Sequence, residues 1–408
     1  MQVLLSSIGS RGDVQPIVAL GVELQVLGHR ARLCVAPNFK EWIESYGLEC
    51  VPIGPDLKKM TGGTVLGKPV LPFSKEQLQQ LADEMVHGQF RVIGEAAHDC
   101  DLIVAAAALQ IATRSIAEAG DIPYVFAAYC PAVLPSSHYP PPKMGGHYSH
   151  SRSEAENLQL WKEDEESFNQ RFGAVLNEER AKIGQGPVTS VQRYMFTDRP
   201  WLAADPVLAP ASLTGMEVVQ TGAWMISDEA PLPVEVEEFL ANGEPPIYLG
   251  FGSMRASDQT GRVLIEAARA LGLRSILSQG WAGLTPSDPE DTDDCLSIGD
   301  VNHAKLFPRV AAIVHHGGAG TTQTAARAGT AQVIIPHNYD QFYWAHRVQE
   351  LGIGVSGPLR DDITVDNLVQ ALRECLRPEV TTRAHEVAGG MQLHGARIAA
   401  ERLTNEFG

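Results

Sequence analysis

The sequence of 408 residues lacks any long hydrophobic run, and no stretch approaches the roughly 18 apolar residues of a membrane-spanning helix. Its opening residues, MQVLLSSIGSRGD, lack the charged and the full apolar regions of a secretory signal peptide. Cysteine is scarce too: the six residues are scattered without a CxxC pair, which is typical of reduced thiols. These absences predict a cytoplasmic protein without a membrane segment.

Positive charge is also in short supply. Lys and Arg number 32 against 49 Asp and Glu, which gives a formal net charge of -17. A surface of this sign repels nucleic acid and anionic membranes, so we expect neither as a partner. An anionic ligand would depend on local hydrogen-bond donors rather than on the field of the whole protein.

Strands and helices alternate in two blocks of the chain. In the first block, residues 2–7 and 30–37 have the apolar pattern of strands, and residues 14–28 between them have helical spacing. The same order of strand, glycine turn and helix begins again at PPIYLGFGSM, residues 245–254. This alternation predicts an α/β fold with two doubly wound parallel sheets, and the chain length suits two domains.

The predicted boundary between the domains lies in the stretch LAPASLTGMEVVQT, residues 208–221. The first domain would then comprise residues 1–207. Within it, the segment 135–150 is rich in proline, histidine and tyrosine and cannot form a regular element, so its role stays open. Two doubly wound domains form a cleft, and ligands of such sheets bind beyond the carboxyl ends of the strands.

The segment HHGGAGTT, residues 315–322, follows a predicted buried strand and opens a helix. Its glycines let the backbone turn sharply and approach a ligand, and a helix N-terminus favours an anion. The imidazoles and the threonine hydroxyls add donors, which favours a diphosphate site. A plain tight turn with exposed histidines is the alternative. A zinc site with His337 and His346 is the third option, but neither HExxH nor a paired CxxC is present.

Four further loops after strands carry candidate residues for a ligand. Ser253 in GFGSM could donate to the same diphosphate, although a small turn explains the segment equally well. Asp340 and Gln341 combine acceptors and donors that suit vicinal sugar hydroxyls, although the acid could simply cap a helix. Trp281 and Val301 are the candidates for a nucleobase pocket, and core packing is the alternative for the tryptophan.

The loop GSRGDVQP, residues 9–16, holds the corresponding position in the first domain. It is not a GxGxxG dinucleotide fingerprint, and no acidic residue ends the second strand, so a nicotinamide enzyme fits poorly. Asp13 would act either as a helix N-cap or as a general base that projects into the cleft. Ser10, Arg11 and Gly12 are candidates for a hinge or phosphate loop beside it.

Together these segments resemble the inverting nucleotide-sugar glycosyltransferases of the GT-B fold. The sequence is most similar to the actinomycete enzymes that glycosylate vancomycin-type antibiotics, and it also resembles sterol glucosyltransferases. The resemblance covers nearly the whole chain. The motifs that carry it are GSRGDVQPIVALGVELQVLGH, LAADPVLAP, QTGAW, YLGFGSM, ILSQGWAGL, VNHAKLF, HHGGAGTTQTAARAG and DQFYWAHRVQELGIGV.

The resemblance implies two Rossmann-like domains that face a cleft, with acceptor bound by the first and donor by the second, residues 222–388. A last helix within residues 389–408 would cross back to the first domain. Asp13 matches the base that deprotonates the acceptor, and no metal or other cofactor is implied. The donor positions match as follows: Ser253, His315, His316, Gly318, Gly320 and Thr321 for the diphosphate, with His315 favoured over His316; Asp340 and Gln341 for the sugar; Val301 for the base.

We therefore expect transfer of a hexose from UDP-glucose or a dTDP-sugar to a hydroxyl of a hydrophobic natural product. A sterol or polyphenol is the fallback acceptor, and the protein would be a monomer or weak dimer. A non-catalytic nucleotide-sugar binder of the same fold is the alternative from another class, and an epimerase would need further acids around the sugar. His337 departs from the family, which tends to carry glutamine there, so the sugar and the acceptor both stay open.

Overall fold

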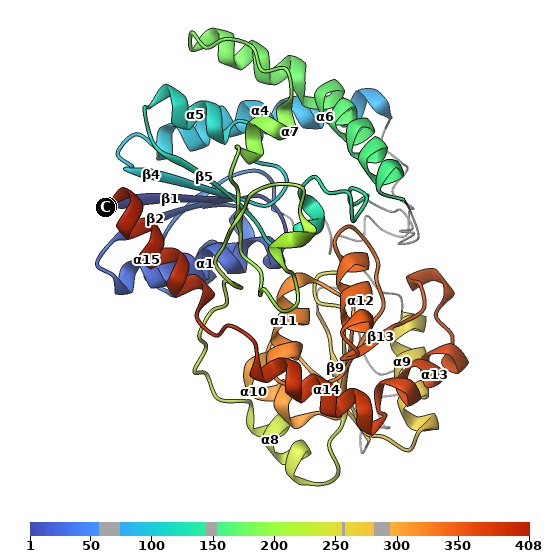
Figure 1. The fold of residues 1–408 in the computed structure, drawn as a ribbon. Coiled ribbons are helices and arrows are strands. Elements are labelled where there is room, and N and C mark those ends of the chain that lie inside the picture. The colour runs from blue at the N-terminus through green and yellow to red at the C-terminus, as the bar shows by residue number, and fades with distance from the viewer. Residues whose placement is uncertain (57–73, 144–152, 255–257, 281–293) are drawn as a thin grey trace. The chain divides into compact units, whose positions relative to one another are not determined.

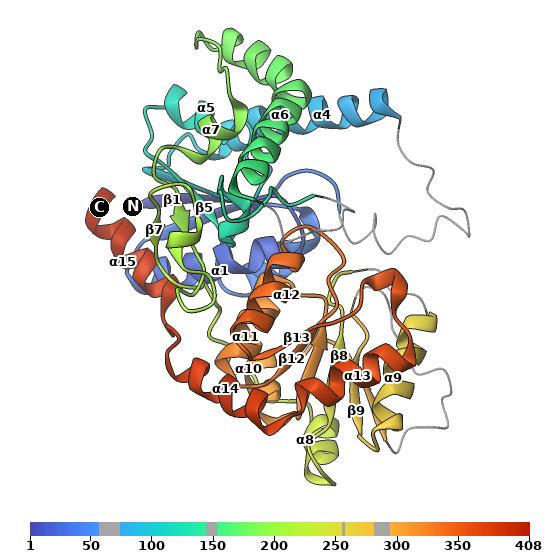
Figure 2. The same ribbon diagram turned by 45° about the vertical axis from the view of Figure 1, so that its right-hand side comes forward.

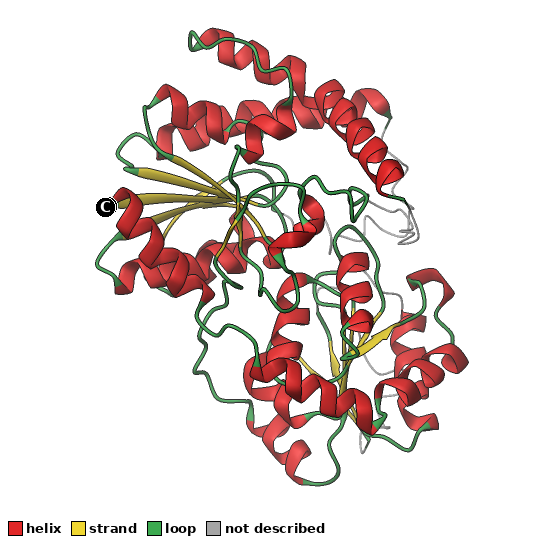
Figure 3. Cartoon of the chain, viewed as in Figure 1, coloured by secondary structure: helices red, strands yellow, loops and turns green. Residues whose placement is uncertain are grey.

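The computed structural model describes residues 1–56, 74–143, 153–254, 258–280 and 294–408 (Figure 1). The chain divides into two compact units. The first takes in Met1–Pro141, Ser151–Ile226 and Gln392–Gly408, and the second takes in Pro142–His150 and Ser227–Met391. Each unit is built around one parallel sheet with helices on both of its faces (Figure 3).

The first unit contains a seven-stranded sheet in the order β3-β2-β1-β4-β5-β6-β7. The chain steps outward from β1 to β3 and then returns to β4 on the other side of β1, so the strand order reverses beside β1. All of its neighbouring strands are parallel. The strands are β1 (Gln2–Ser7), β2 (Arg30–Val35), β3 (Glu49–Pro52), β4 (Leu102–Ala106), β5 (Tyr124–Ala128), β6 (Trp201–Leu202) and β7 (Val219–Gln220).

Helices of the first unit cover both faces of this sheet. The described ones are α1 (Arg11–Val26), α2 (Lys40–Glu44), α4 (Lys75–Ala96), α5 (Thr113–Ala119), α6 (Glu154–Lys182), α7 (Val191–Phe196) and α15 (Gly395–Phe407). The C-terminal α15 packs against α1, while α4, α5, α6 and α7 lie on the opposite face, as both views show (Figures 1 and 2). The last residues of the chain thus belong to the first unit.

The second unit contains a six-stranded parallel sheet in the order β10-β9-β8-β11-β12-β13. Its strands are β8 (Ile247–Gly250), β9 (Ser275–Ser278), β10 (Cys295–Ile298), β11 (Ala312–His315), β12 (Gln332–Ile334) and β13 (Gly354–Ser356). Its described helices are α8 (Val234–Ala241), α9 (Asp258–Ala270), α10 (His303–Leu306), α11 (Ala319–Arg327), α12 (Gln341–Glu350), α13 (Val365–Cys375) and α14 (Pro378–Gly389).

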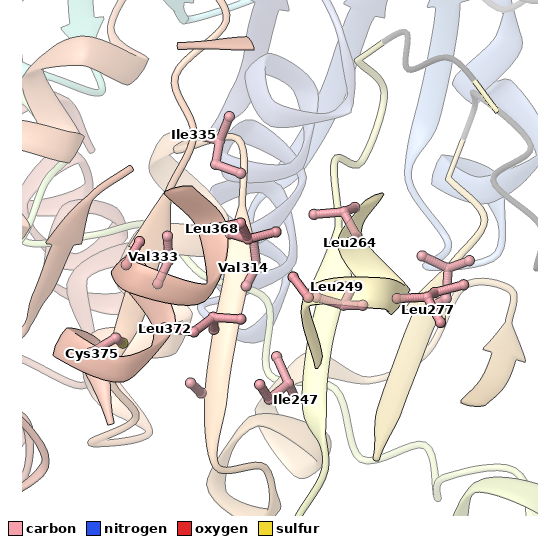
Figure 4. Close-up of a cluster of buried hydrophobic side chains, with 14 of the residues drawn as sticks. Ile247, Leu249, Leu264, Leu277, Val314, Val333, Ile335, Leu368, Leu372 and Cys375 are labelled. Carbon is pink, nitrogen blue, oxygen red and sulfur yellow. The ribbon is translucent and has the colours of Figure 1, made fainter. Parts of the chain in front are cut away.

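The core of the second unit follows the two-residue period of its strands. Ile247 and Leu249 of β8 join the cluster in Figure 4, which includes Leu368 and Leu372 of α13. Tyr248, between them in sequence, points to the opposite face and joins a second cluster. Apolar residues on both faces explain the near-continuous hydrophobic runs of these strands, because helices cover both sides of a parallel sheet.

Two local predictions need correction. The predicted linker 208–221 lies within the first unit, where β7 pairs with β6. Its single two-residue strand leaves almost no hydrophobic period in a stretch rich in small residues. The helix predicted to begin at Val14 begins at Arg11, because Ser10 caps it, and Pro16 lies inside the helix rather than in its first turn.

All six cysteines lie in the described part of the chain, where they are buried and form no disulfide. The prediction of reduced thiols agrees with this. Among the described helices, none combines the length and the apolar character needed to cross a membrane.

Candidate functional site

Most of the predicted ligand-binding residues follow three neighbouring strands of the second sheet, β8, β11 and β12. Residues Gly250, His315 and Ile334 are in register at the carboxyl ends of these strands. The loops that follow them therefore lie side by side at one edge of the sheet. This edge is where ligands of open α/β sheets bind.

His315, the last residue of β11, is completely buried. Its Nδ1 accepts a hydrogen bond from the backbone N–H of Gly317 at 3.1 Å, and its Nε2 lies 2.9 Å from Oε1 of Gln332. These contacts define a neutral imidazole with the proton on Nε2, and burial lowers its pKa to about 3. Both ring nitrogens are thus engaged in holding the turn after β11.

His316, the next residue, is half-buried and lies between two glycine turns. A Cβ atom on Gly252 would lie 3.2 Å from its Cε1, and one on Gly318 would lie 2.6 Å from its Nε2. A side chain at Gly318 would displace the ring, and Gly252 also has a φ of +57°, which suits glycine. The Nδ1 atom of His316 is buried and has no hydrogen-bond partner in the described part of the chain, and burial lowers the pKa of His316 to about 4.

Helix α11 begins directly beside this ring. Its N-cap is Gly318, which has no side chain to satisfy the first N–H groups of the helix. Thr322 does not cap the helix, because its hydroxyl donates backward to the carbonyl of Gly318 at 3.0 Å. Thr321 is half-buried and Gly320 is exposed in this first turn. An uncapped helix start beside an imidazole is a favourable place for an anion.

The loop between β12 and α12 orients the predicted sugar-binding pair. The Oε1 atom of Gln341 accepts the backbone N–H groups of His337 at 2.8 Å and of Asn338 at 2.9 Å. Its Nε2 points toward Sδ of Met254 at 3.5 Å, so Gln341 presents an amide donor to this edge. Asp340 is the N-cap residue of α12. Its Oδ2 accepts a hydrogen bond from Nε1–H of the buried Trp344 at 2.9 Å.

His337, in the same loop, is the most unusual side chain of this edge. Both of its ring nitrogens are buried, and neither has a hydrogen-bond partner among the described residues. Its ring packs against Phe251 of the β8 turn, with centroids 4.8 Å apart, and burial lowers its pKa to about 3. A buried imidazole nitrogen ordinarily has a hydrogen-bond partner, so the ring of His337 is a candidate to contact a ligand at this edge.

The remaining donor candidates are less defined. Ser253 is half-buried in the turn after β8, which the bond from Met254 N to Phe251 O closes at 3.0 Å. Val301 is partly buried and packs against the cluster around Tyr248. Trp281 lies outside the described residues.

Asp13 lies in the first unit, in the first turn of α1 after β1, the strand beside which the strand order reverses. It is the partner of the N-cap rather than the N-cap itself. Its Oδ2 accepts the N–H of Ser10 at 2.7 Å and the Ser10 hydroxyl at 3.2 Å. Among the contacts of the described residues, Oδ1 takes no part in this cap. The backbone carbonyl of Asp13 accepts hydroxyl groups from Ser7 and Tyr129.

The surroundings of Asp13 leave room for its carboxylate and raise its pKa. A Cβ atom on Gly9 would lie 2.1 Å from Oδ2, so this position must be glycine. Burial raises the pKa of Asp13 from 3.8 to about 6, although the two bonds from Ser10 oppose the shift. A carboxylate with this pKa is more basic than an ordinary aspartate and still ionised at neutral pH.

The neighbours of Asp13 have structural contacts of their own. The guanidinium of Arg11 lies over the ring of Trp42, 4.9 Å from its centroid, and Gly12 is exposed. Among the described residues, no group of three His, Cys, Asp or Glu side chains is placed to hold a metal ion.

Some contributors to these sites were not identified from the sequence. Gln332 fixes the tautomer of His315, Trp344 orients Asp340, and Tyr129 braces the turn that carries Asp13. A glutamine inside the apolar run AQVIIP was the available signal for Gln332, since a polar side chain in a buried strand needs a partner.

Comparison with known proteins identifies the family. Residues 3–136 match the glycosyltransferase family 28 N-terminal domain, and residues 292–395 match the C-terminal domain of erythromycin biosynthesis protein CIII-like proteins. The chain is 44% identical to the vancomycin aglycone glucosyltransferase of Amycolatopsis orientalis, over 99% of this chain and 97% of that protein. The chain belongs to the vancomycin-group glycosyltransferases.

Other relatives place this glycosyltransferase in a wider group. It is 39% identical to the dTDP-epi-vancosaminyltransferase of A. orientalis, over 95% of this chain and 93% of the relative. It is 30% identical to the sterol 3-beta-glucosyltransferase UGT80A2 of Arabidopsis thaliana, over 96% of this chain and 63% of that protein.

Solved structures agree on the fold of this glycosyltransferase. The glycosyltransferase of kitacinnamycin superposes with a TM-score of 0.72 at 17% identity and covers 100% of this chain and 99% of its own. VinC in complex with dTDP superposes with a TM-score of 0.68 at 19% identity and covers 99% of both chains. The predicted GT-B fold of two Rossmann-like domains is therefore confirmed.

Proposed function

We propose that this enzyme moves a hexose from UDP-glucose or a dTDP-sugar to a hydroxyl of a glycopeptide aglycone, with inversion at the anomeric carbon. The observation that carries the donor half is the single edge where His316, the uncapped start of α11 and the pair Asp340–Gln341 follow neighbouring strands. The acceptor half rests on the 44% identity with the vancomycin aglycone glucosyltransferase.

The proposed donor site uses local donors in place of a positive field. The first N–H groups of α11 and the ring of His316 face the diphosphate, with Ser253 and Thr321 as further donors. His315 shapes the turn instead of touching the ligand, because its two nitrogens are engaged by Gly317 and Gln332. These groups stabilise the nucleoside diphosphate most as negative charge develops on the leaving oxygen.

The two residues of the α12 start have complementary parts in holding the sugar. The amide nitrogen of Gln341 donates and the carboxylate of Asp340 accepts, so together they suit a pair of neighbouring hydroxyls. Trp344 keeps the Asp340 carboxylate in place from within the core. In this way the packing of α12 fixes the sugar before the reaction.

The proposed reaction is a single displacement. The acceptor hydroxyl attacks the anomeric carbon, the bond from that carbon to the diphosphate oxygen breaks, and the carboxylate of Asp13 takes the hydroxyl proton. Its pKa of about 6 suits this task, because the group is ionised at pH 7 and still a better base than an exposed aspartate. We propose that the reaction proceeds without a metal ion, since the helix start and the imidazole supply the positive poles.

The test is a panel of donors and acceptors read by mass spectrometry, with the anomeric configuration of the product determined by NMR. UDP-glucose and dTDP-glucose are each offered with a vancomycin-type aglycone, a sterol and a polyphenol, with and without a chelator. We expect a β-linked glycosyl aglycone in both the treated and untreated samples. Donor binding without any product would favour a non-catalytic sugar-nucleotide binder, and a sterol product alone would replace the proposed acceptor. If a chelator abolished product formation and one divalent ion restored it, the metal-free mechanism would be overturned.

A further inference from the structure

Three imidazoles gather at the carboxyl edge of β11 and β12, and they differ in how their nitrogens are used. His315 has both nitrogens engaged, whereas His316 has one buried nitrogen, Nδ1, and His337 has two for which the described residues supply no partner. The rings are close to one another. The ring centroids of His315 and His316 lie 6.3 Å apart, and the charge of a protonated His316 lowers the pKa of His337. The nitrogens of His316 and His337 that no described residue satisfies are candidates to bind a ligand.

We propose that binding of the nucleotide sugar places a proton on His316, so that the diphosphate is held by an imidazolium that the empty enzyme does not contain. This inference rests on the proposed donor function and deepens it. It changes the charge of the site at the moment of binding. In an enzyme with a net charge of -17, it supplies one positive charge where the ligand is negative.

The empty site keeps His316 neutral. Burial lowers its pKa to about 4, and no carboxylate raises it. Among the described residues, the titratable groups that act on these rings are the imidazoles themselves, His303, which acts on His315, and Arg360 and Asp361, which act on His337 with opposite sign. Burial opposes a positive charge on His316, so an added anion would stabilise the protonated ring.

The diphosphate of the donor would bind at the start of α11, toward which the ring of His316 is directed. The Nε2 atom of His316 lies beside Gly318, the residue that opens α11, because a Cβ added there would come within 2.6 Å of it. A diphosphate at the helix start would therefore contact Nε2 directly. The nearby negative charge favours the imidazolium and raises its pKa, and protonation leaves N–H donors on both ring nitrogens.

The other two imidazoles are less suited to take this proton. His315 could be protonated at Nδ1 only by losing the bond from Gly317 N–H. His337 lies in the loop after β12 rather than beside the start of α11, and burial above all lowers its pKa. His316 alone combines an unsatisfied nitrogen with a place at the helix start.

The coupling between proton binding and donor binding determines how donor affinity changes with pH. If the bound enzyme holds one more proton than the empty enzyme, donor affinity falls as pH rises through the pKa of bound His316. Proton uptake is largest between about 4, the pKa of the empty site, and that higher value. Above the bound-state pKa, uptake declines to zero and affinity becomes independent of pH.

The experiment is titration calorimetry of UDP-glucose and dTDP-glucose in buffers of different ionisation enthalpy, without acceptor. Both phosphates of these donors are esterified and do not titrate in this range, so the protons counted belong to the protein. Asp13→Asn serves as the background, because its own carboxyl has a pKa of about 6. We expect uptake of about half a proton or more at pH near 5.5, decreasing toward zero by about pH 8.

Three further variants, at two positions, assign the proton. In the Asp13→Asn background, His316→Asn should bind the donor at least several-fold more weakly at pH 5.5 and without proton uptake, and His316→Gln repeats the test with a longer amide. His337→Gln should retain the uptake. Thermal unfolding of each variant shows whether it is folded.

The outcomes separate the two proposals. Donor binding without proton uptake would overturn this inference and leave the proposed function intact. Uptake that survives in both His316 variants and disappears in His337→Gln would overturn the assignment to His316. A folded Asp13→Asn protein that binds neither donor would overturn the proposed function and this inference together.

Discussion

At the scale of the residue, Asp13 combines a structural contact with the properties expected of a base. Its Oδ2 caps α1 through Ser10, and burial at the same time raises its pKa to about 6. The sequence left the choice between a cap and a base open. The geometry makes the two roles compatible, because the cap uses one oxygen of the carboxylate.

Replacing Asp13 with asparagine separates these roles. The amide oxygen can still accept the Ser10 N–H, but it cannot take a proton from the acceptor. We expect kcat to fall about 10²–10⁴-fold, while donor affinity near pH 8 stays within about twofold of wild type. Steady-state kinetics and calorimetry check this, with Ser10→Ala as the variant that weakens the cap alone. Equal turnover in Asp13→Asn would end the base assignment.

The raised pKa of Asp13 also predicts a pH-dependent stability. The folded state binds the Asp13 proton more tightly than the unfolded state does. Protonation of Asp13 therefore adds to the free energy of unfolding, and this contribution is fully present below pH 3.8 and lost as pH rises through about 6. Asp13→Asn does not titrate. Its melting temperature relative to wild type should therefore rise between about pH 4 and pH 6.5 and level off above that range. A difference that stays flat across the range would mean that the pKa is not raised.

The clearance around His316 predicts a strong effect of a single methyl group. Gly318→Ala would place a Cβ 2.6 Å from Nε2 of His316 and displace the ring from the helix start. We expect donor affinity to fall about tenfold or more, since the diphosphate loses its imidazole partner. Gly389→Ala at the end of α14 is the matched control, because its Cβ meets nothing within 4 Å. Calorimetry with UDP-glucose compares the two.

At the scale of the element, the sequence predicts most of the strands and the helices between them. Continuous apolar runs mark β1, β5, β8 and β11 because both faces of each sheet are covered. The start of α1 was placed three residues late, although Ser10 and Asp13 have the spacing of a capping box. Strand β7 was missed because two residues carry no period.

The candidate binding residues lie in loops after strands, where ligands of parallel sheets bind, and their assignment stays a prediction. Their individual contacts were beyond the sequence. Nothing in HHGG tells which imidazole faces the core, because that depends on Gln332 of the neighbouring strand. The orientation of Gln341 likewise depends on two backbone N–H groups of its own loop.

Helix α15 makes a prediction at this scale. Leu403 is fully buried in the packing of α15 on the first unit, where Ala396, Ala399 and Ala400 are also buried. Leu403→Ala should lower the free energy of unfolding of this unit by about 2–5 kcal/mol. Ile398→Ala, at a position of the same helix that is 37% exposed, should cost far less. Denaturant unfolding of both variants tests this, and equal effects would mean that α15 is not held by its buried face.

At the scale of the whole molecule, the net charge of -17 opposes an anionic donor. In the proposed donor site the attraction comes from the helix start and the imidazoles at short range, whereas the repulsion is long-range and is screened by salt. We therefore expect the association rate of UDP-glucose to rise as salt increases from about 10 to about 150 mM, where the Debye length falls to about 8 Å. Stopped-flow binding measures this rate, and uridine, which has no charge, is the control whose rate should not change. A rate that falls with salt would show that the enzyme steers its donor by a positive field, which would require charged groups beyond those of the proposed site.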